Sequence, residues 1–247
     1  HIAALPQFKM PGRYINRTRP SLPAESRVSD QAETLMRLCE RVILTNGGVL
    51  GIGIGETFAR DLGTGIEDVQ WAGSGGFAAY GADRYVNIGG ATQTLVWGQA
   101  NFVGGDNELV FGAADSTHTL IFENNIEMDG TNRFRANNGF ADVDGRITGN
   151  LSDKSGSVGT FFKTGDGVLE LTGSNTYSGG PEVLGGQLLL SGSNALSENS
   201  LLVISNYGVI TLGATDFTRD LGTNGGDVVW TGSGGFAASG AKPPLDR

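Results

Sequence analysis

The sequence predicts an all-β fold in which short strands repeat and stack on one another. Glycine occurs 41 times in 247 residues and proline only 7 times, a balance that favours dense turns. Short segments of alternating apolar residues follow each other closely after residue 41, without helices between them, which excludes a sheet built from βαβ units. A long segment also returns later in the chain, so the strands belong to a repeating array.

Residues 163–190 form the clearest single unit of this array. Two alternating segments, Val168–Leu171 and Gln187–Leu190, flank a loop of Gly, Ser, Asn, Thr and Tyr. Alternation places Leu169 and Leu171 on one face of their strand. Because neither strand can bury its apolar face alone, we expect the unit to be one coil of a stack.

The longest internal repeat defines a block that is larger than one coil. Residues 58–82 return as residues 217–241 at an offset of 159 residues, and 18 of the 25 positions are identical. The sequence therefore predicts a block of several coils over about residues 46–205, with the next block starting at about residue 206.

Strand-like triplets recur inside the block between corners rich in Gly, Asn and Asp. The first and third residues of each triplet share a face, and we expect them to point inward: Val69 and Trp71, Leu95 and Trp97, Leu109 and Phe111, and Leu120 and Phe122. Further strands are predicted near residues 85–88, 141–147, 159–162 and 201–204. A sandwich or an antiparallel barrel is the alternative arrangement of such strands.

Residues 1–41 differ from the repeating region, which we place at residues 42–247. They contain four of the prolines and seven Lys or Arg against four Asp or Glu. An irregular segment with a short helix at about residues 30–41 is predicted. It either caps the open end of the stack or is foreign to the array. The single cysteine, Cys39, permits no internal disulfide bond.

Residues 163–190 resemble the passenger-associated transport repeat, also called the autotransporter-associated β-strand repeat. The residues that carry the resemblance are Lys163, Gly165, Gly167, Leu169, Leu171, Gly173, Asn175, Thr176, Tyr177, Gly179, Val183, Gly186, Leu188 and Leu190. Pro181 departs from the pattern, where the family usually has Thr. The resemblance covers about 28 of the 247 residues. It implies a right-handed parallel β-helix, a β-solenoid, in the passenger of a type V secreted bacterial protein.

The resemblance also implies a function and a location. We expect a non-enzymatic structural or adhesive stalk, surface-displayed or secreted, that crosses the outer membrane through its own C-terminal β-barrel. Host surfaces or extracellular glycans are the implied partners. The alternative is a carbohydrate-active or glycan-binding β-helix protein. The net charge of −9 arises from an acidic body, with ten Lys or Arg against twenty-two Asp or Glu after residue 41, and this disfavours nucleic acid as a partner.

The sequence assigns no catalytic residue, cofactor site or metal site, although several carboxylates lie in patterns that catalytic or calcium sites also use. Asp142 and Asp144 are expected to share one strand face, which would suit a glycan-cleaving pair. Residues 104–108 and 142–145 gather oxygen ligands as calcium loops do, but turn stabilisation is the favoured interpretation. His118 has no second histidine at a metal-ligand spacing.

If the protein binds a partner directly, exposed residues on the loops are the candidates for contact. Tyr80 and Tyr85 are predicted to be exposed, as are Asn137 and Asn138.

Overall fold

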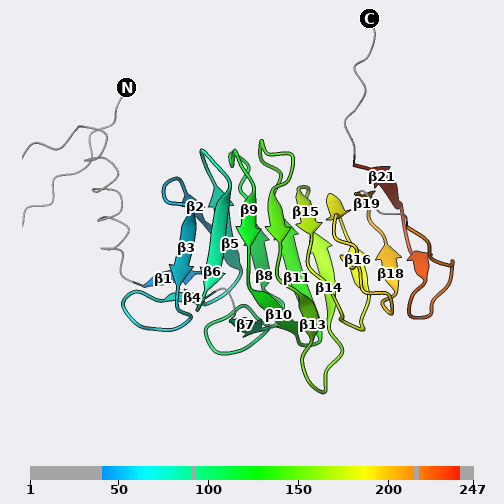
Figure 1. Cartoon of the computed structure of the whole chain (residues 1–247), viewed down its shortest axis with the longest axis horizontal. Helices are drawn as coiled ribbons and strands as arrows, with labels where there is room; N and C mark the ends of the chain where they lie inside the picture. Colours follow the sequence, from blue (N-terminus) through cyan, green and yellow to red (C-terminus); the bar gives the residue numbers. More distant parts are fainter. Residues whose placement is uncertain (1–40, 91–92, 214–216, 240–247) are drawn as a thin grey trace, which may run out of the picture.

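Short strands and glycine-rich corners wind the chain into a β-solenoid of about seven turns (Figure 1). The structure is a computed structural model and describes residues 41–90, 93–213 and 217–239. These residues contain no helix, and thus none that is long and apolar enough to cross a membrane. The predicted helix at about residues 30–41 falls on residues 1–40, which lie outside the described residues.

Two parallel sheets of eight strands run the length of the solenoid (Figure 1). Sheet 1 contains β2 (Gly48–Ile52), β5 (Gly75–Ala79), β8 (Glu108–Phe111), β11 (Thr131–Ala136), β14 (Thr160–Thr164), β16 (Pro181–Val183), β18 (Leu202–Ile204) and β20 (Val228–Trp230). Sheet 2 contains β3 (Thr57–Arg60), β6 (Arg84–Ile88), β9 (Leu120–Phe122), β12 (Gly145–Ile147), β15 (Val168–Leu171), β17 (Gln187–Leu190), β19 (Gly208–Leu212) and β21 (Gly234–Ala238). Within each turn, a strand of sheet 1 is followed by a strand of sheet 2.

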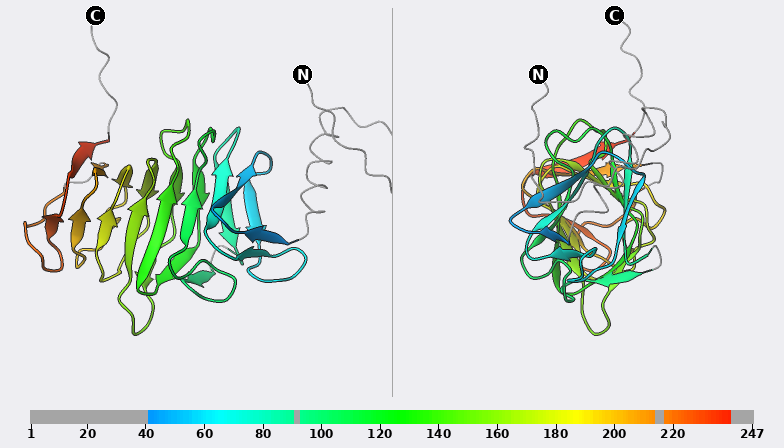
Figure 2. Two further views of the ribbon diagram at one scale, coloured as in Figure 1. Left: turned by 180° about the vertical axis from the view of Figure 1, so that it is seen from behind. Right: turned by 90° about the vertical axis from the view of Figure 1, so that its left-hand side faces the viewer.

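Shorter pairings form a third face toward the N-terminal end. There β1 (Val42–Leu44) pairs with β4 (Val69–Trp71), while β10 (Asn125–Met128) lies between β7 (Thr94–Val96) and β13 (Leu151–Asp153). Every pairing between these named strands is parallel. The end-on view in Figure 2 shows the strands arranged around the axis of the stack. The predicted all-β parallel solenoid is therefore confirmed.

The register of sheet 2 places apolar residues of one turn directly opposite apolar residues of the next turn. Leu169 lies opposite Leu188, which in turn lies opposite Ile210. All three side chains are buried in the interior. Burying one such side chain stabilises the fold by roughly 1.5–3 kcal/mol, so a column of them holds successive turns together.

Aromatic side chains fill much of the interior on the side of sheet 1. Phe134 is fully buried at the centre of this column, with its ring centroid 5.4 Å from Trp97 and 5.3 Å from Phe161. Phe161 then contacts Tyr177 of the next turn at 5.6 Å. The inward-pointing residues predicted from the triplets are all buried, namely Val69, Trp71, Leu95, Trp97, Leu109, Phe111, Leu120 and Phe122.

Buried asparagines link the backbones of neighbouring turns at the corner that follows sheet 2. The Asn124 side chain accepts a hydrogen bond from the Ile88 amide (2.7 Å) and donates to the Ile88 and Gln93 carbonyls (2.8 and 3.0 Å). Asn175 repeats this role, since it accepts from the Leu151 amide at 2.8 Å. The backbone at this corner forms no strand pairing. The side-chain amides of the two asparagines therefore satisfy backbone groups that would otherwise be buried without partners.

The two copies of the long repeat have the same local structure but lie on different faces of the solenoid. The first copy supplies β4 to the third face and β5 to sheet 1. The second copy supplies β20 to sheet 1 and β21 to sheet 2. After one block of 159 residues the same sequence therefore lies one face further around the axis, in addition to a whole number of turns along it.

One predicted strand is wrong at its start. The sequence predicts a strand over residues 141–147, whereas β12 begins only at Gly145. The preceding residues bend because the Asp144 carboxylate accepts hydrogen bonds from the backbone amides of Gly139 (2.7 Å) and Val168 (2.8 Å). This side chain thus directs the corner between the two long sheets rather than extending a strand.

The aromatic column gives a direct test of the core. We expect Phe134→Ala to lower the free energy of unfolding by about 3–5 kcal/mol, because it removes a buried ring and leaves a cavity. Phe140→Ala is the matched control, since that ring is 77% exposed, and it should change stability by no more than about 0.5 kcal/mol. Urea unfolding followed by circular dichroism measures both. Equal effects of the two substitutions would contradict the assigned core.

Candidate functional site

The corner between sheet 1 and sheet 2 collects the buried charges and an open groove. After β8, β11, β14 and β16 the chain leaves sheet 1, makes a glycine-rich turn and enters sheet 2. These turns stack on one another, so residues that are far apart in the sequence become neighbours there. Gly165 takes a left-handed backbone (φ 75°) and a Cβ there would collide with the Ala136 carbonyl of the preceding turn, which only glycine avoids.

Lys163 is buried at this corner and binds the backbone of two turns. Its ammonium group donates to the carbonyls of Thr164, Gly165 and Gly185, each at 3.0 Å. Burial lowers the pKa of Lys163 to about 8, against the opposing pull of the nearby carboxylates of Asp144 and Asp166. Lys163, the first residue of the motif in residues 163–190, thus holds two successive turns together through their backbone carbonyls.

Asp144 is the buried acidic counterpart of Lys163. Its two oxygens accept the backbone amides of Gly139 and Val168, one from its own loop and one from the next turn. Burial raises the pKa of Asp144, while the two backbone hydrogen bonds and Lys163 oppose that rise. Both charges are satisfied by the backbone of the corner.

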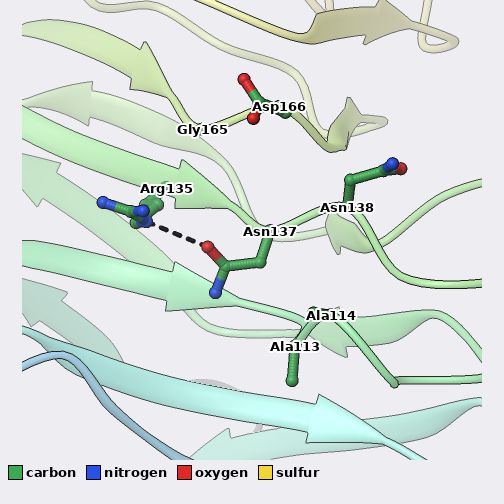
Figure 3. Close-up of a pocket in the computed structure, with 7 residues that line it drawn as sticks. All are labelled: Ala113, Ala114, Arg135, Asn137, Asn138, Gly165 and Asp166. Carbon is green, nitrogen blue, oxygen red and sulfur yellow. Dashed lines mark hydrogen bonds between the residues drawn. The ribbon is translucent and has the colours of Figure 1, made fainter.

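An open groove of about 590 Å³ lies on the outside of the same corner (Figure 3). Residues of three successive turns line it, namely Ala113, Ala114, Arg135, Asn137, Asn138, Gly165 and Asp166. Of these, Ala114, Arg135, Asn138 and Asp166 are exposed, and Figure 3 shows Asp166 and Asn138 on the side away from Ala113 and Ala114.

Polar contacts hold one wall of the groove. The Arg135 guanidinium donates to the Asn137 side-chain oxygen at 2.9 Å and pairs with Glu108 at 3.3 Å. The Asn137 amide donates in turn to the Gly112 carbonyl at 3.0 Å. A guanidinium, two amides and a carboxylate offer both donors and acceptors, which suits a neutral polar ligand such as a sugar.

The remaining motif residues are structural in their contacts. The side chains of Leu169, Leu171, Tyr177, Val183, Leu188 and Leu190 are buried in the core. Asn175 bridges two turns, and Thr176 is exposed while its amide donates to the Leu151 carbonyl. At Gly167, Gly173, Gly179 and Gly186 an added Cβ would collide with the neighbouring turn.

The expectation that Asp142 and Asp144 share one strand face is wrong. Asp142 is exposed and Asp144 is fully buried, and both lie in the bend before β12 rather than in a strand. The two carboxyl groups therefore do not face a common cleft, as the pair in a glycan-cleaving enzyme must.

The loop carboxylates considered as calcium ligands have other partners. Asp106 pairs with Arg133 at 3.3 Å, and Glu108 pairs with Arg135 and accepts from Thr164 at 2.7 Å. Within the described part of the chain, no three His, Cys, Asp or Glu side chains converge as a metal site would require.

The other predicted contact residues are less exposed than expected. Tyr80 is half-buried and its hydroxyl donates to Asp115 at 2.6 Å, while Tyr85 is half-buried in β6. His118 lies half-buried just before β9. Asn137 and Asn138, in contrast, line the groove. The sequence did not indicate Asp166 beside them, because it follows β14 in the next turn and only stacking brings it to Asn137 and Asn138.

Comparison with known proteins adds no assignment to this geometry. No protein-family model matches the chain, and neither a curated protein nor a solved structure is significantly similar to it.

Lys163 predicts a pH dependence of stability. Its pKa is about 8 in the folded protein and 10.5 where the side chain is exposed in the unfolded chain, so the unfolded chain binds more protons between these values. Stability should therefore rise with pH from about 8 upward, by on the order of 2–3 kcal/mol over the whole window. The rise should be absent in Lys163→Met.

Urea unfolding at several pH values between about 7.5 and 10 measures this effect, below the range in which the raised pKa of Tyr177 adds a loss of stability. Asn138→Ala, which changes no charge, is the control and should follow the unsubstituted protein. Parallel pH profiles for the unsubstituted protein and Lys163→Met would contradict the buried position of the lysine.

Proposed function

We propose that this protein is a non-enzymatic passenger stalk of a bacterial autotransporter, displayed at the cell surface or secreted. The observation that carries the proposal is the pair of eight-stranded parallel sheets that runs along the longest axis of the described residues (Figure 1). Continuous sheets with an interdigitated core resist bending and extension, as a stalk must. The return of the opening of the block after 159 residues supports the same role, because further blocks lengthen a rod without a new fold.

The motif in residues 163–190 supports the autotransporter assignment. Its Lys and Asn positions join one turn to the next, through the Lys163 contacts to three carbonyls and the Asn175 bridge between turns. A sequence pattern that encodes the closure of a single turn suits a chain that folds turn by turn as it emerges from an outer membrane. The proposed partner in export is the protein's own C-terminal β-barrel translocator, and the proposed destination is extracellular.

An adhesive role through glycans is the second candidate, and the groove at the corner favours it. Arg135, Asn137, Asn138 and Asp166 present donors and acceptors on a rigid wall contributed by successive turns. Sugars are bound through such planar polar groups. Glycan cleavage receives no support from Asp142 and Asp144, and it is not proposed.

Export tests the main proposal. The chain is inserted between a signal peptide and the β-barrel of a known autotransporter, and added protease and antibody report its surface exposure. We expect surface display at a level similar to that of the vector's own passenger. Phe134→Asp, which places a charge in the core, should display poorly and be degraded. Retention of the unsubstituted chain inside the cell, while the vector's own passenger is displayed, would refute the proposal.

Binding to an array of bacterial and host glycans tests the second candidate. For any glycan bound, we expect Asn138→Ala combined with Asp166→Ala to weaken binding by about tenfold or more, since two hydrogen-bonding groups are lost. Asp142→Ala is the matched control, because this exposed carboxylate lies outside the groove lining. Binding that survives the double substitution would place the glycan elsewhere.

A further inference from the structure

The C-terminal end of the stack exposes a set of aromatic residues that belong to a core. Trp230 is 42% exposed and Phe236 is 40% exposed, with Phe217 packed on Phe236 at 5.2 Å. Their strands are the last of their sheets among the described residues, so β20 and β21 each have one open edge. We call the surface formed by these three side chains and two strand edges the end face.

The first copy of the repeat carries the same residues in a covered state. Trp71 and Phe77, the counterparts of Trp230 and Phe236, are 4% and 0% exposed. The ring contacts within each copy agree, with the tryptophan and phenylalanine centroids 5.9 Å apart in the first copy and 5.6 Å in the second. The two copies therefore share their local geometry and differ in what lies against them.

One turn of the solenoid covers the first copy. Phe102 places its ring 5.1 Å from Trp71, and β8 pairs with β5 so that Phe111 lies opposite Phe77. In this way an aromatic loop and an apolar strand together bury the face. Residues 94–111 are thus a template for whatever covers the end face.

A glycine provides an independent indication of the missing neighbour. A Cβ on Gly76 would overlap the carbonyl oxygen of Val110 in the covering strand. Its counterpart Gly235 has no atom within 4 Å of such a Cβ. Among the described residues, a Cβ at position 235 would meet no other atom. A glycine is required at position 235 only if a further strand docks there, as β8 docks on β5.

The strand content of the two copies points the same way. Thr57–Arg60 forms β3 in the first copy, where its only strand partner is β6 of the following turn. Residues 217–219, the counterparts of residues 58–60, form no strand. This segment is a strand only where the later partner is present.

We propose that the end face is a docking surface for one further β-coil with the chemistry of residues 83–122 of this chain. By the template of the first copy, the docked coil adds a parallel strand to the open edge of β21, as β8 does on β5, and lays a loop against β20, as the loop with Phe102 does on β4. It places a phenylalanine against Trp230 and another opposite Phe236, and its strand passes close over Gly235. Backbone pairing supplies affinity, while the aromatic residues and the glycine supply selectivity. The proposal does not depend on the function proposed above.

An extended chain tests the proposal. A second copy of residues 83–122 is joined directly after Ala241. This repeats the order of the first copy, in which residue 83 follows Ala82, the counterpart of Ala241. We expect the amides of β21 to exchange with solvent about tenfold or more slowly than in the original chain, because its open edge becomes paired. Exchange rates in β21 that do not change would overturn the proposal.

Gly235→Val separates docking from a general gain in stability. In the original chain this substitution should leave unfolding and exchange unchanged, because the site is open. In the extended chain it should remove the protection of β21. Gly76→Val, which introduces the same clash in the covered copy, should disrupt the original chain and serves as the positive control. Equal protection of β21 with and without Gly235→Val would overturn the proposed docking geometry.

A second copy of the protein is the competing occupant. Sedimentation of the original chain distinguishes it, and we expect a monomer. A dimer that Trp230→Lys converts to monomers would show that the end face pairs with itself, and would overturn the assignment of a further coil.

Discussion

Parallel, in-register pairing between successive turns is the constraint on which the whole structure depends. Each strand between the ends of the two long sheets finds hydrogen-bonding partners in the turn before and the turn after, so the backbone is satisfied only if every turn follows nearly the same path. Side chains at equivalent positions then lie directly over one another, as Leu169, Leu188 and Ile210 do. The core is a consequence of that register, and so is the rigidity expected of a stalk.

The corners are where this constraint is hardest to satisfy. Backbone carbonyls and amides at the corners have no partners in a β-ladder, and polar side chains replace those partners. Lys163 binds three carbonyls, Asp144 binds two amides, and Asn124 binds both kinds of group. Burying such groups is costly unless they are fully paired. Most of the buried polar chemistry of the described residues is therefore committed to the backbone, and ligand contacts are left to the exposed side chains of the groove.

The two copies of the repeat separate local structure from environment. Similar sequences give matching strands around the tryptophan and the phenylalanine, the same Trp–Phe contact and the same hydrogen bond from the indole to a glycine carbonyl, at 2.9 Å in the first copy and 3.3 Å in the second. Yet the copies occupy different faces and differ in burial, from 4% at Trp71 to 42% at Trp230. Successive blocks would thus present the same surface in different directions around the axis, which fits the displayed stalk that we propose.

The sequence by itself determined many of the strands, the inward-facing residues of the triplets and the repeating architecture, because alternation and glycine spacing are local properties of the chain. It did not indicate β10, β11 or β13. Lys163 stood out in the sequence as part of a motif, but its burial and its contacts to two turns came from the fold. Only the tertiary structure could separate Asp142 from Asp144, since the bend between them depends on an amide of the next turn. The sequence did not predict the groove, because the groove too depends on contacts between turns. Its residues belong to three turns, and stacking, which no local pattern encodes, decides which of them meet.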